Sequence, residues 1–75
     1  MIMMFGKVIK QVRNTLSITQ EQLARELKVS FSTVNRWENL KSNPSPLAKE
    51  NFLAFCSKNN IDLDSFVIKV GMKND

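Results

Sequence analysis

The chain has 75 residues, a hydrophobic content of 43% and a formal net charge of +4, and these values exclude several classes of protein. A core this small leaves little room for an enclosed substrate cavity, so we expect a single domain, residues 1–75, with its function on the surface and no enzymatic activity. One cysteine, Cys56, and no histidine exclude an internal disulfide and a four-ligand zinc site. We therefore expect no metal and no other cofactor, and we interpret Cys56 as a small core residue.

The amino-terminal part of the chain is basic. Its apolar opening, MIMMF, stops at Gly6 and is too short for a signal peptide or a membrane span, so we expect a cytoplasmic protein without membrane contact. Residues 1–20 then contain Lys7, Lys10 and Arg13 and no acidic residue. Such an excess usually serves solubility, so nucleic-acid binding needs the support of a motif.

Five helices and no strand are expected, which makes the fold class all-α. The predicted helices are 5–15, 19–28, 30–39, 45–58 and 62–70. In the first, apolar residues recur at helical spacing between Phe5 and Leu16. The second begins with a capping box, in which the Thr19 hydroxyl accepts from the Gln22 backbone and the Gln22 side chain reaches back. Capping residues also stand at the starts of the three later helices: Ser30, Ser45 and Asp62.

The second and third predicted helices form a helix-turn-helix. Only Lys28 and Val29 separate the end of one from the cap of the next, so the chain must turn steeply there. Helical spacing directs Val34 and Trp37 of the third helix toward the core, so Trp37 is interpreted as a core residue and not as a base-stacking one. Polar side chains then remain on the outer face: Ser32, Asn35, Arg36 and Asn39.

The segment TQEQLARELKVSFSTVNRWENLKSNPSP, residues 19–46, resembles the core of the lambda-repressor-like, Cro-type helix-turn-helix family, also known as the xenobiotic-response-element family. The five-helix plan extends the resemblance over about residues 5–70. It implies a compact five-helix domain that binds double-stranded DNA and reads the major groove with helix 30–39. It also implies a structural ion pair between Arg13 and Glu38, which links the first helix to the end of the third.

The resemblance and the outer face of the third helix together suggest a set of DNA contacts. The predicted base contacts are Phe31, Ser32, Asn35 and Arg36. The predicted phosphate contacts are Thr19, Gln20, Thr33, Lys41 and Asn43. Two interpretations of Phe31 stay open, because it either packs locally or touches a thymine methyl group. Gln20 could instead only complete the cap, and Lys41 and Asn43 could lie in a solvated loop, although no acid occurs in residues 39–49.

Two positions depart from the family pattern. The family commonly has glycine where this chain has Lys28 and Leu40, at helix carboxyl ends that tend to need a positive φ. A residue other than glycine costs on the order of 1 kcal/mol at such a site. Asn39 is the alternative to Leu40 for the left-handed conformation in the second of these turns.

The expected function is transcriptional regulation, as a repressor or autoregulator. One such domain reads about half an operator, so we expect a homodimer on a palindromic site. Its expected dimer surface is the outer face of the fifth helix: Phe66, Val67, Ile68 and Val70. Two alternatives are an antitoxin that also represses its operon and a protein-interaction module that kept only the fold. The candidate protein partners are a toxin and RNA polymerase.

Overall fold

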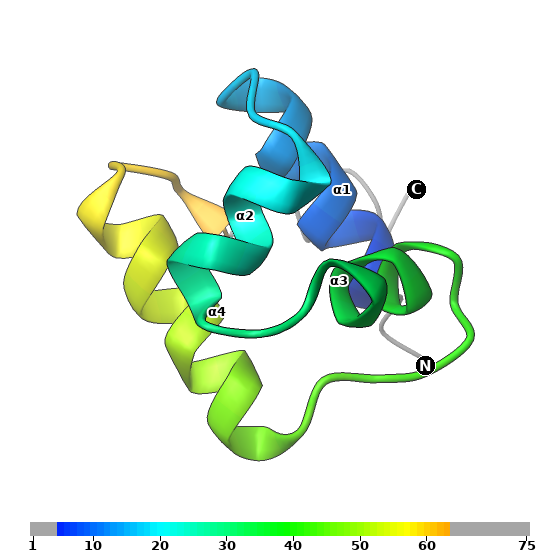
Figure 1. Cartoon of the computed structure of the whole chain (residues 1–75). Coiled ribbons are helices and arrows are strands. Elements are labelled where there is room, and N and C mark those ends of the chain that lie inside the picture. Colours follow the sequence, from blue (N-terminus) through cyan, green and yellow to red (C-terminus); the bar gives the residue numbers. More distant parts are fainter. Residues whose placement is uncertain (1–4, 64–75) are drawn as a thin grey trace, which may run out of the picture.

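The computed structural model describes residues 5–63 of the chain, and within this range it contains four helices and no strand. The helices are α1 (Phe5–Thr15), α2 (Gln20–Leu27), α3 (Phe31–Glu38) and α4 (Pro46–Lys58). Figure 1 shows α2 and α3 joined by a short turn, with α3 packed on α1 and α2 and with α4 packed on α2. Within residues 5–63 the all-α prediction is confirmed, and each of the four helices lies within a residue of its predicted range. The predicted fifth helix, 62–70, falls almost entirely outside the described residues.

Side-chain hydroxyl groups cap the amino ends of three of these helices, as the sequence predicts. The capping box of α2 is complete: Thr19 Oγ1 accepts from the Gln22 backbone N–H at 3.0 Å, and Gln22 Oε1 accepts from the Thr19 backbone N–H at 2.8 Å. The hydroxyls of Ser30 and Ser45 each accept from the backbone N–H three residues later, at 3.2 Å. Each bond satisfies a donor that the first turn of a helix leaves without an intrahelical acceptor.

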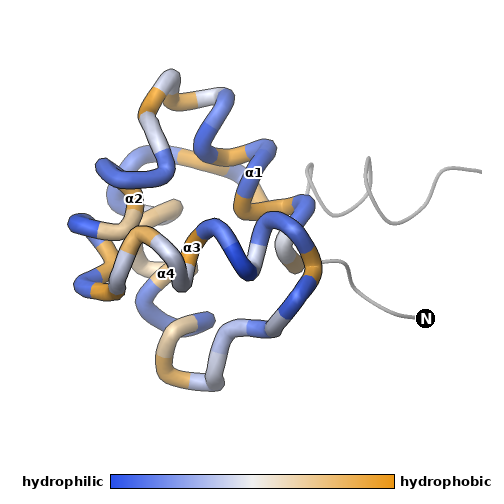
Figure 2. Tube along the Cα trace, turned by 45° about the vertical axis from the view of Figure 1, so that its right-hand side comes forward, coloured by the Kyte–Doolittle hydropathy of each residue, from blue (hydrophilic) through white to orange (hydrophobic). Residues whose placement is uncertain are grey.

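One cluster of apolar side chains from all four helices forms the core. Its buried members are Val8, Ile9, Val12, Leu23, Ala24, Leu27, Val34, Trp37, Phe52, Phe55 and Cys56. Figure 2 shows the corresponding alternation of hydrophobic and hydrophilic stretches along the helices. Trp37 is 4% exposed, so its predicted place in the core is confirmed. Burial raises the pKa of the Cys56 thiol to about 11, so the thiol stays protonated at neutral pH and packs as a small apolar group.

The two turns that lack the family's glycine contain left-handed residues. Lys28 has a φ of 59° and Leu40 a φ of 60°. The alternative in which Asn39 replaces Leu40 is wrong, because Asn39 has a φ of −91°. Asn39 donates its side-chain N–H to the Asn35 carbonyl at 2.9 Å, and the Lys41 backbone N–H bonds to the Arg36 carbonyl at 2.9 Å. These bonds close the helix end around Leu40, as is usual for a left-handed cap.

Gly6 allows α1 to lie directly against the carboxyl end of α3. A Cβ atom at this position would lie 1.9 Å from the Trp37 carbonyl oxygen, and 3.0 Å from a methyl carbon of Leu40. The distance to the carbonyl oxygen is too short for any side chain, so only glycine fits at this position. Sequence analysis does not single out this residue, since glycine in the first turn of a helix has many uses and the contact is remote in sequence.

Replacing Gly6 with alanine tests this close approach. In an isolated helix the change would add about 1 kcal/mol of stability. Here it should instead lower the free energy of unfolding by roughly 1 to 3 kcal/mol, because the added methyl group overpacks the contact with Trp37. Urea unfolding measures the difference. The control is Lys7→Ala at the exposed neighbouring position, which should change stability by less than about 0.5 kcal/mol. A Gly6→Ala protein as stable as the wild type would refute the contact.

Candidate functional site

The polar face predicted for the third helix lies on the surface of the structure. Ser32 and Arg36 are exposed on α3, Phe31 at its first position is half exposed, and Asn35 is partly buried. The amino end of α2 and the loop from Leu40 to Ser45 lie next to α3, and the loop runs along the lower right of Figure 1. The predicted base and phosphate contacts therefore come from three neighbouring segments.

The structure brings Arg13 of α1 and Glu38 of α3 together. Arg13 Nε donates to Glu38 Oε2 at 2.8 Å and Arg13 Nη2 donates to Glu38 Oε1 at 2.9 Å, so the pair is bidentate. The side chain of Glu38 is 3% exposed and that of Arg13 is 15% exposed. A third Arg13 nitrogen, Nη1, donates to the Ile18 carbonyl at 3.1 Å. This arginine therefore joins α1 to α3 and to the segment that leads into α2.

Gln20 extends the ion pair into a network that reaches the outer face of α3. Its Nε2 donates to Glu38 Oε1 at 2.9 Å, and its Oε1 accepts from Asn35 Nδ2 at 3.1 Å. Asn35 Oδ1 in turn accepts from Asn39 Nδ2 at 3.1 Å. From the sequence, Gln20 is predicted as a phosphate contact and Asn35 as a base contact, and neither is predicted to hold the helices together. Asn35 keeps one N–H and one lone pair for another partner.

The network controls the charge of Glu38. Burial alone would raise the pKa of this carboxyl group, but the hydrogen bonds from Arg13 and Gln20 and the charges of Arg13 and Lys10 outweigh it, so its pKa is lowered. Glu38 is therefore ionised at neutral pH. The hydrogen bond from Arg13 to Glu38 raises the pKa of Arg13, and this outweighs the burial of Arg13, which lowers it. Each of the two groups thus stabilises the charged form of the other.

The amino end of α2 presents backbone donors. Thr19 and Gln22 use their side chains in the capping box, which satisfies the backbone N–H of each. The backbone N–H groups of Gln20 and Glu21 also belong to this first turn, where an α-helix provides no internal acceptor. They lie at the positive end of the helix dipole, a site that suits an anion.

Two further predicted phosphate contacts lie in the loop after α3, and a third lies in α3. Lys41 and Asn43 are exposed. Thr33 is partly buried, and its hydroxyl is 2.8 Å from the hydroxyl of Ser30. The other lysine of the acid-free stretch, Lys49, lies over the ring of Phe5 at 5.7 Å from its centre. Lys49 therefore packs on α1, and within residues 39–49 only Lys41 supplies charge to the loop.

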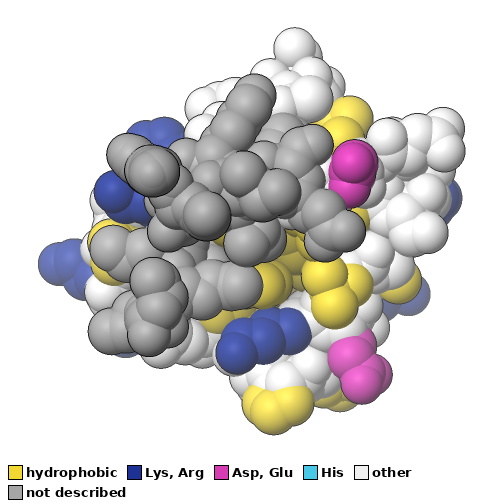
Figure 3. All heavy atoms as spheres, turned by 180° about the vertical axis from the view of Figure 1, so that it is seen from behind, with side chains coloured by type: hydrophobic (Ala, Val, Ile, Leu, Met, Phe, Trp, Pro, Cys, Tyr) yellow, Lys and Arg dark blue, Asp and Glu magenta, His cyan; other side chains and the backbone are white. Residues whose placement is uncertain are grey.

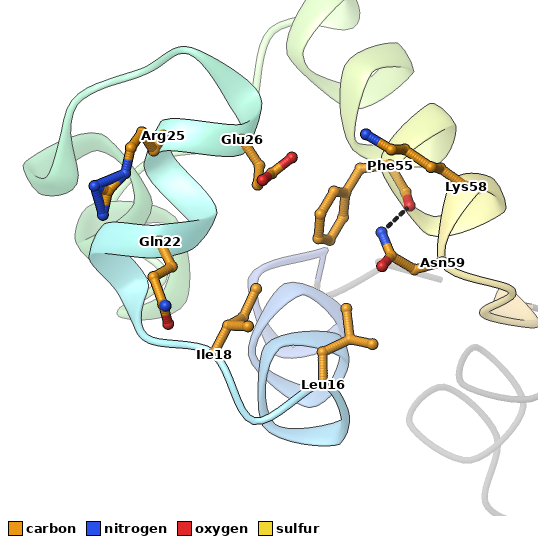
Figure 4. A pocket seen from close by; sticks show the side chains of 8 residues that line it. All are labelled: Leu16, Ile18, Gln22, Arg25, Glu26, Phe55, Lys58 and Asn59. Atoms are coloured by element: carbon orange, nitrogen blue, oxygen red, sulfur yellow. Dashed lines mark hydrogen bonds between the residues drawn. The ribbon is translucent and has the colours of Figure 1, made fainter.

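Apolar side chains also reach the surface elsewhere. In Figure 3, a view from behind, the described atoms that are visible beside the grey ones include hydrophobic side chains among scattered charges. A hollow of about 410 Å³ between α2, α4 and the turn that joins α1 to α2 has Leu16, Ile18 and Phe55 on its walls (Figure 4). Charged side chains, among them Arg25 and Lys58, also line it, and no residue of α3 takes part. The hollow is thus separate from the polar face.

Among residues 5–63, no group of three or more histidine, cysteine, aspartate or glutamate side chains is placed to hold a metal ion. No helix in that range is both long and apolar enough to cross a membrane. The predicted dimer surface, Phe66, Val67, Ile68 and Val70, lies outside the described residues.

Comparisons with known proteins point to the same segment. The family model of the helix-turn-helix matches residues 9–48. A stretch of 43 residues is 40% identical to the HTH-type transcriptional activator BcrR of Enterococcus faecalis. This stretch is 57% of the chain but only 21% of that protein, so the chain spans about a fifth of the length of this relative. No solved structure matches the chain.

Replacing Arg13 with methionine tests the ion pair. The variant leaves the nearly buried Glu38 carboxylate without its main partner, so the free energy of unfolding at pH 7 should fall by roughly 1 to 3 kcal/mol. The pKa of Glu38 is lowered in the folded protein, so its stabilising effect is present above the ordinary glutamate pKa of about 4.3 and is lost as the pH falls through the lower folded value. The gap between wild type and variant should therefore shrink in acid.

Urea unfolding between pH 7 and pH 3 measures both effects. Arg25→Met is the matched control, since Arg25 is exposed on α2, and this variant should stay within about 0.5 kcal/mol of the wild type. An Arg13→Met protein that behaves like this control at pH 7 would mean that the pair does not stabilise the fold.

Proposed function

Because the chain belongs to the lambda-repressor-like helix-turn-helix family, we propose that it is a sequence-specific, double-stranded-DNA-binding regulator of transcription. The observation that carries this proposal is the exposed polar face of α3, held in a fixed orientation beside the amino end of α2. A face of this kind fits the major groove, where an α-helix can reach the edges of the bases. In this proposal residues 1–75, with a fifth helix at 62–70, form a single DNA-binding domain acting on cytoplasmic DNA.

Phosphate contacts on both sides of α3 would set the position of the protein on the duplex. The backbone N–H groups at the start of α2, beside Thr19 and Gln20, would bind one phosphate. Lys41 and Asn43 would bind another from the loop after α3, and Thr33 would bind through its hydroxyl. These contacts carry no sequence information, and they make the affinity depend on salt.

Base contacts from α3 would determine the sequence that is bound. Arg36 is exposed and long enough to place its guanidinium on O6 and N7 of a guanine. Ser32 is exposed beside it, and Asn35 keeps the one donor and one acceptor that recognition of adenine requires. Phe31 is the apolar member of this set. Together these residues give α3 different groups for successive base pairs.

A palindromic operator and a homodimer follow from the size of the recognition surface. One α3 covers about half a typical operator, and two copies would place their α3 helices about one helical turn apart. We assign the dimer surface to Phe66, Val67, Ile68 and Val70, more apolar residues than one inward stripe of a fifth helix would use. A symmetric motif selected from random DNA would support the dimer, whereas a single asymmetric half-site would count against it.

We propose repression, including autoregulation, as the direction of control, because a domain bound across a promoter blocks access to it. The relative in Enterococcus faecalis bears the name of an activator, so contact with RNA polymerase is the competing mode. A promoter-reporter assay distinguishes the two. An antitoxin role or a purely protein-binding role has no observation among the described residues in its favour.

Substitutions in α3 and in the following loop should have different effects on DNA binding. Arg36→Ala should cost about 1 to 3 kcal/mol on the best site and relax the preference at one base pair. Lys41→Ala should weaken binding to all sequences alike and reduce the slope of affinity against salt by about one unit. Fluorescence anisotropy on selected and scrambled duplexes at several salt concentrations measures both.

Lys58→Ala is the matched control, because Lys58 lies on α4 beside the hollow and away from α3. It should change neither the base preference nor the affinity by more than the general effect of one distant charge. The assignment of Arg36 fails if Arg36→Ala weakens every duplex equally and leaves the base preference intact.

A further inference from the structure

Phe31 is a large apolar side chain on the surface, at the first position of α3. Half of its surface, 50%, is exposed, whereas Trp37 in the same helix is 4% exposed. Phe31 is not one of the buried or partly buried apolar side chains of the core cluster. An exposed aromatic ring gains free energy when a partner covers it. Local packing therefore buries only about half of this side chain, and the rest of its surface is available to a partner.

The hydroxyl groups around Phe31 lie close to one another. The Ser30 hydroxyl accepts from the backbone N–H of Thr33 at 3.2 Å. The same hydroxyl lies 3.3 Å from the Ser32 hydroxyl and 2.8 Å from the Thr33 hydroxyl. The hydroxyls at the start of α3 thus form a local cluster, and the phenyl ring of Phe31 is an exposed apolar group beside them.

Phe31 lies at the exposed amino end of the side of α3 that faces α2. Phe31, Asn35 and Glu38 are spaced four and three residues apart, so they share one side of α3. Asn35 and Glu38 both bond to Gln20 at the amino end of α2. Phe31 is therefore one turn beyond this fixed point. In the docking geometry of a helix-turn-helix, the first residues of the second helix meet the edges of the bases.

Only one apolar group is available on the base edges of the major groove, the 5-methyl group of thymine. A phenyl ring cannot donate or accept a hydrogen bond with the neighbouring oxygen or amino group of the base. It can cover the methyl group and exclude water from it. The contact would thus distinguish a methylated pyrimidine from an unmethylated one, whatever group occupies position 4.

We propose that Phe31 is the specificity-determining contact for a 5-methylpyrimidine in each half-site. It selects thymine through its methyl group, and it accepts 5-methylcytosine through the same contact. Binding of this protein therefore responds to cytosine methylation at that position. This inference rests on the proposed function, because it needs α3 in the major groove.

The test uses the duplex selected from random DNA, with each thymine replaced in turn by deoxyuridine. This change removes the methyl group and leaves base pairing intact. At one thymine per half-site, wild-type affinity should fall by about fourfold, the value of one buried methyl group. Placing cytosine there should weaken binding, and 5-methylcytosine should restore about fourfold of the loss.

Variants at position 31 link the effect to this side chain. Phe31→Ala should bind the thymine and deoxyuridine duplexes equally, whereas Phe31→Leu, which keeps an apolar group, should retain part of the preference. Leu47→Ala is the control, since Leu47 is an exposed apolar residue on α4, and it should keep the full preference. Circular dichroism and urea unfolding confirm that each variant is folded.

The outcomes separate this inference from the proposed function. If wild-type protein binds every deoxyuridine-substituted duplex as tightly as the thymine duplex, Phe31 does not read a methyl group. The same conclusion follows if Phe31→Ala keeps the discrimination. In either case a selected motif still supports the proposed function. If selection enriches no sequence at all, the proposed function fails, and this inference fails with it.

Discussion

The carboxylate of Glu38 is the group that fixes three helices of this domain relative to one another. It is almost fully buried, and a buried charge is tolerated only when partners compensate it. Those partners are Arg13 on α1 and Gln20 on α2, so meeting this requirement brings α1, α2 and α3 together at one point. Replacing a whole buried pair with apolar groups need not lower stability, so the effect of this one on geometry matters more than its net energy.

The fixed arrangement has a direct bearing on function. Gln20 is bonded both to Glu38 and to Asn35, so two hydrogen bonds link the start of α2 to α3 and set their spacing. In the proposed complex the start of α2 places the protein on a phosphate, and the outer face of α3 reads the bases. Two surfaces with a set spacing bind without first having to be ordered, which reduces the entropy cost of association. Gly6 contributes from the other side, because it brings α1 against the carboxyl end of α3.

Sequence reasoning succeeded where the structure depends on local chemistry. The starts of α2, α3 and α4 follow from side chains that bond within four residues, and the left-handed Lys28 follows from the short turn. It left two residues open for the left-handed position after α3, Leu40 and Asn39, and the structure has Leu40 there. It also missed contacts between residues far apart in sequence: Gln20 with Glu38, Gly6 with Trp37, and Lys49 with Phe5. Family resemblance, and not spacing, pointed to Arg13 and Glu38.

The central claim is that DNA binds to the face formed by the start of α2, the outer side of α3 and the loop after it. A titration of ¹⁵N-labelled protein with a selected duplex, followed by NMR, tests this most directly, with a scrambled duplex of equal length as the reference. The account predicts that the amide shifts specific to the selected duplex cluster at residues 19–22, 31–36 and 40–43, while those of α4 stay in place. Shifts that cluster instead around α4 and the hollow beside Phe55 would contradict it.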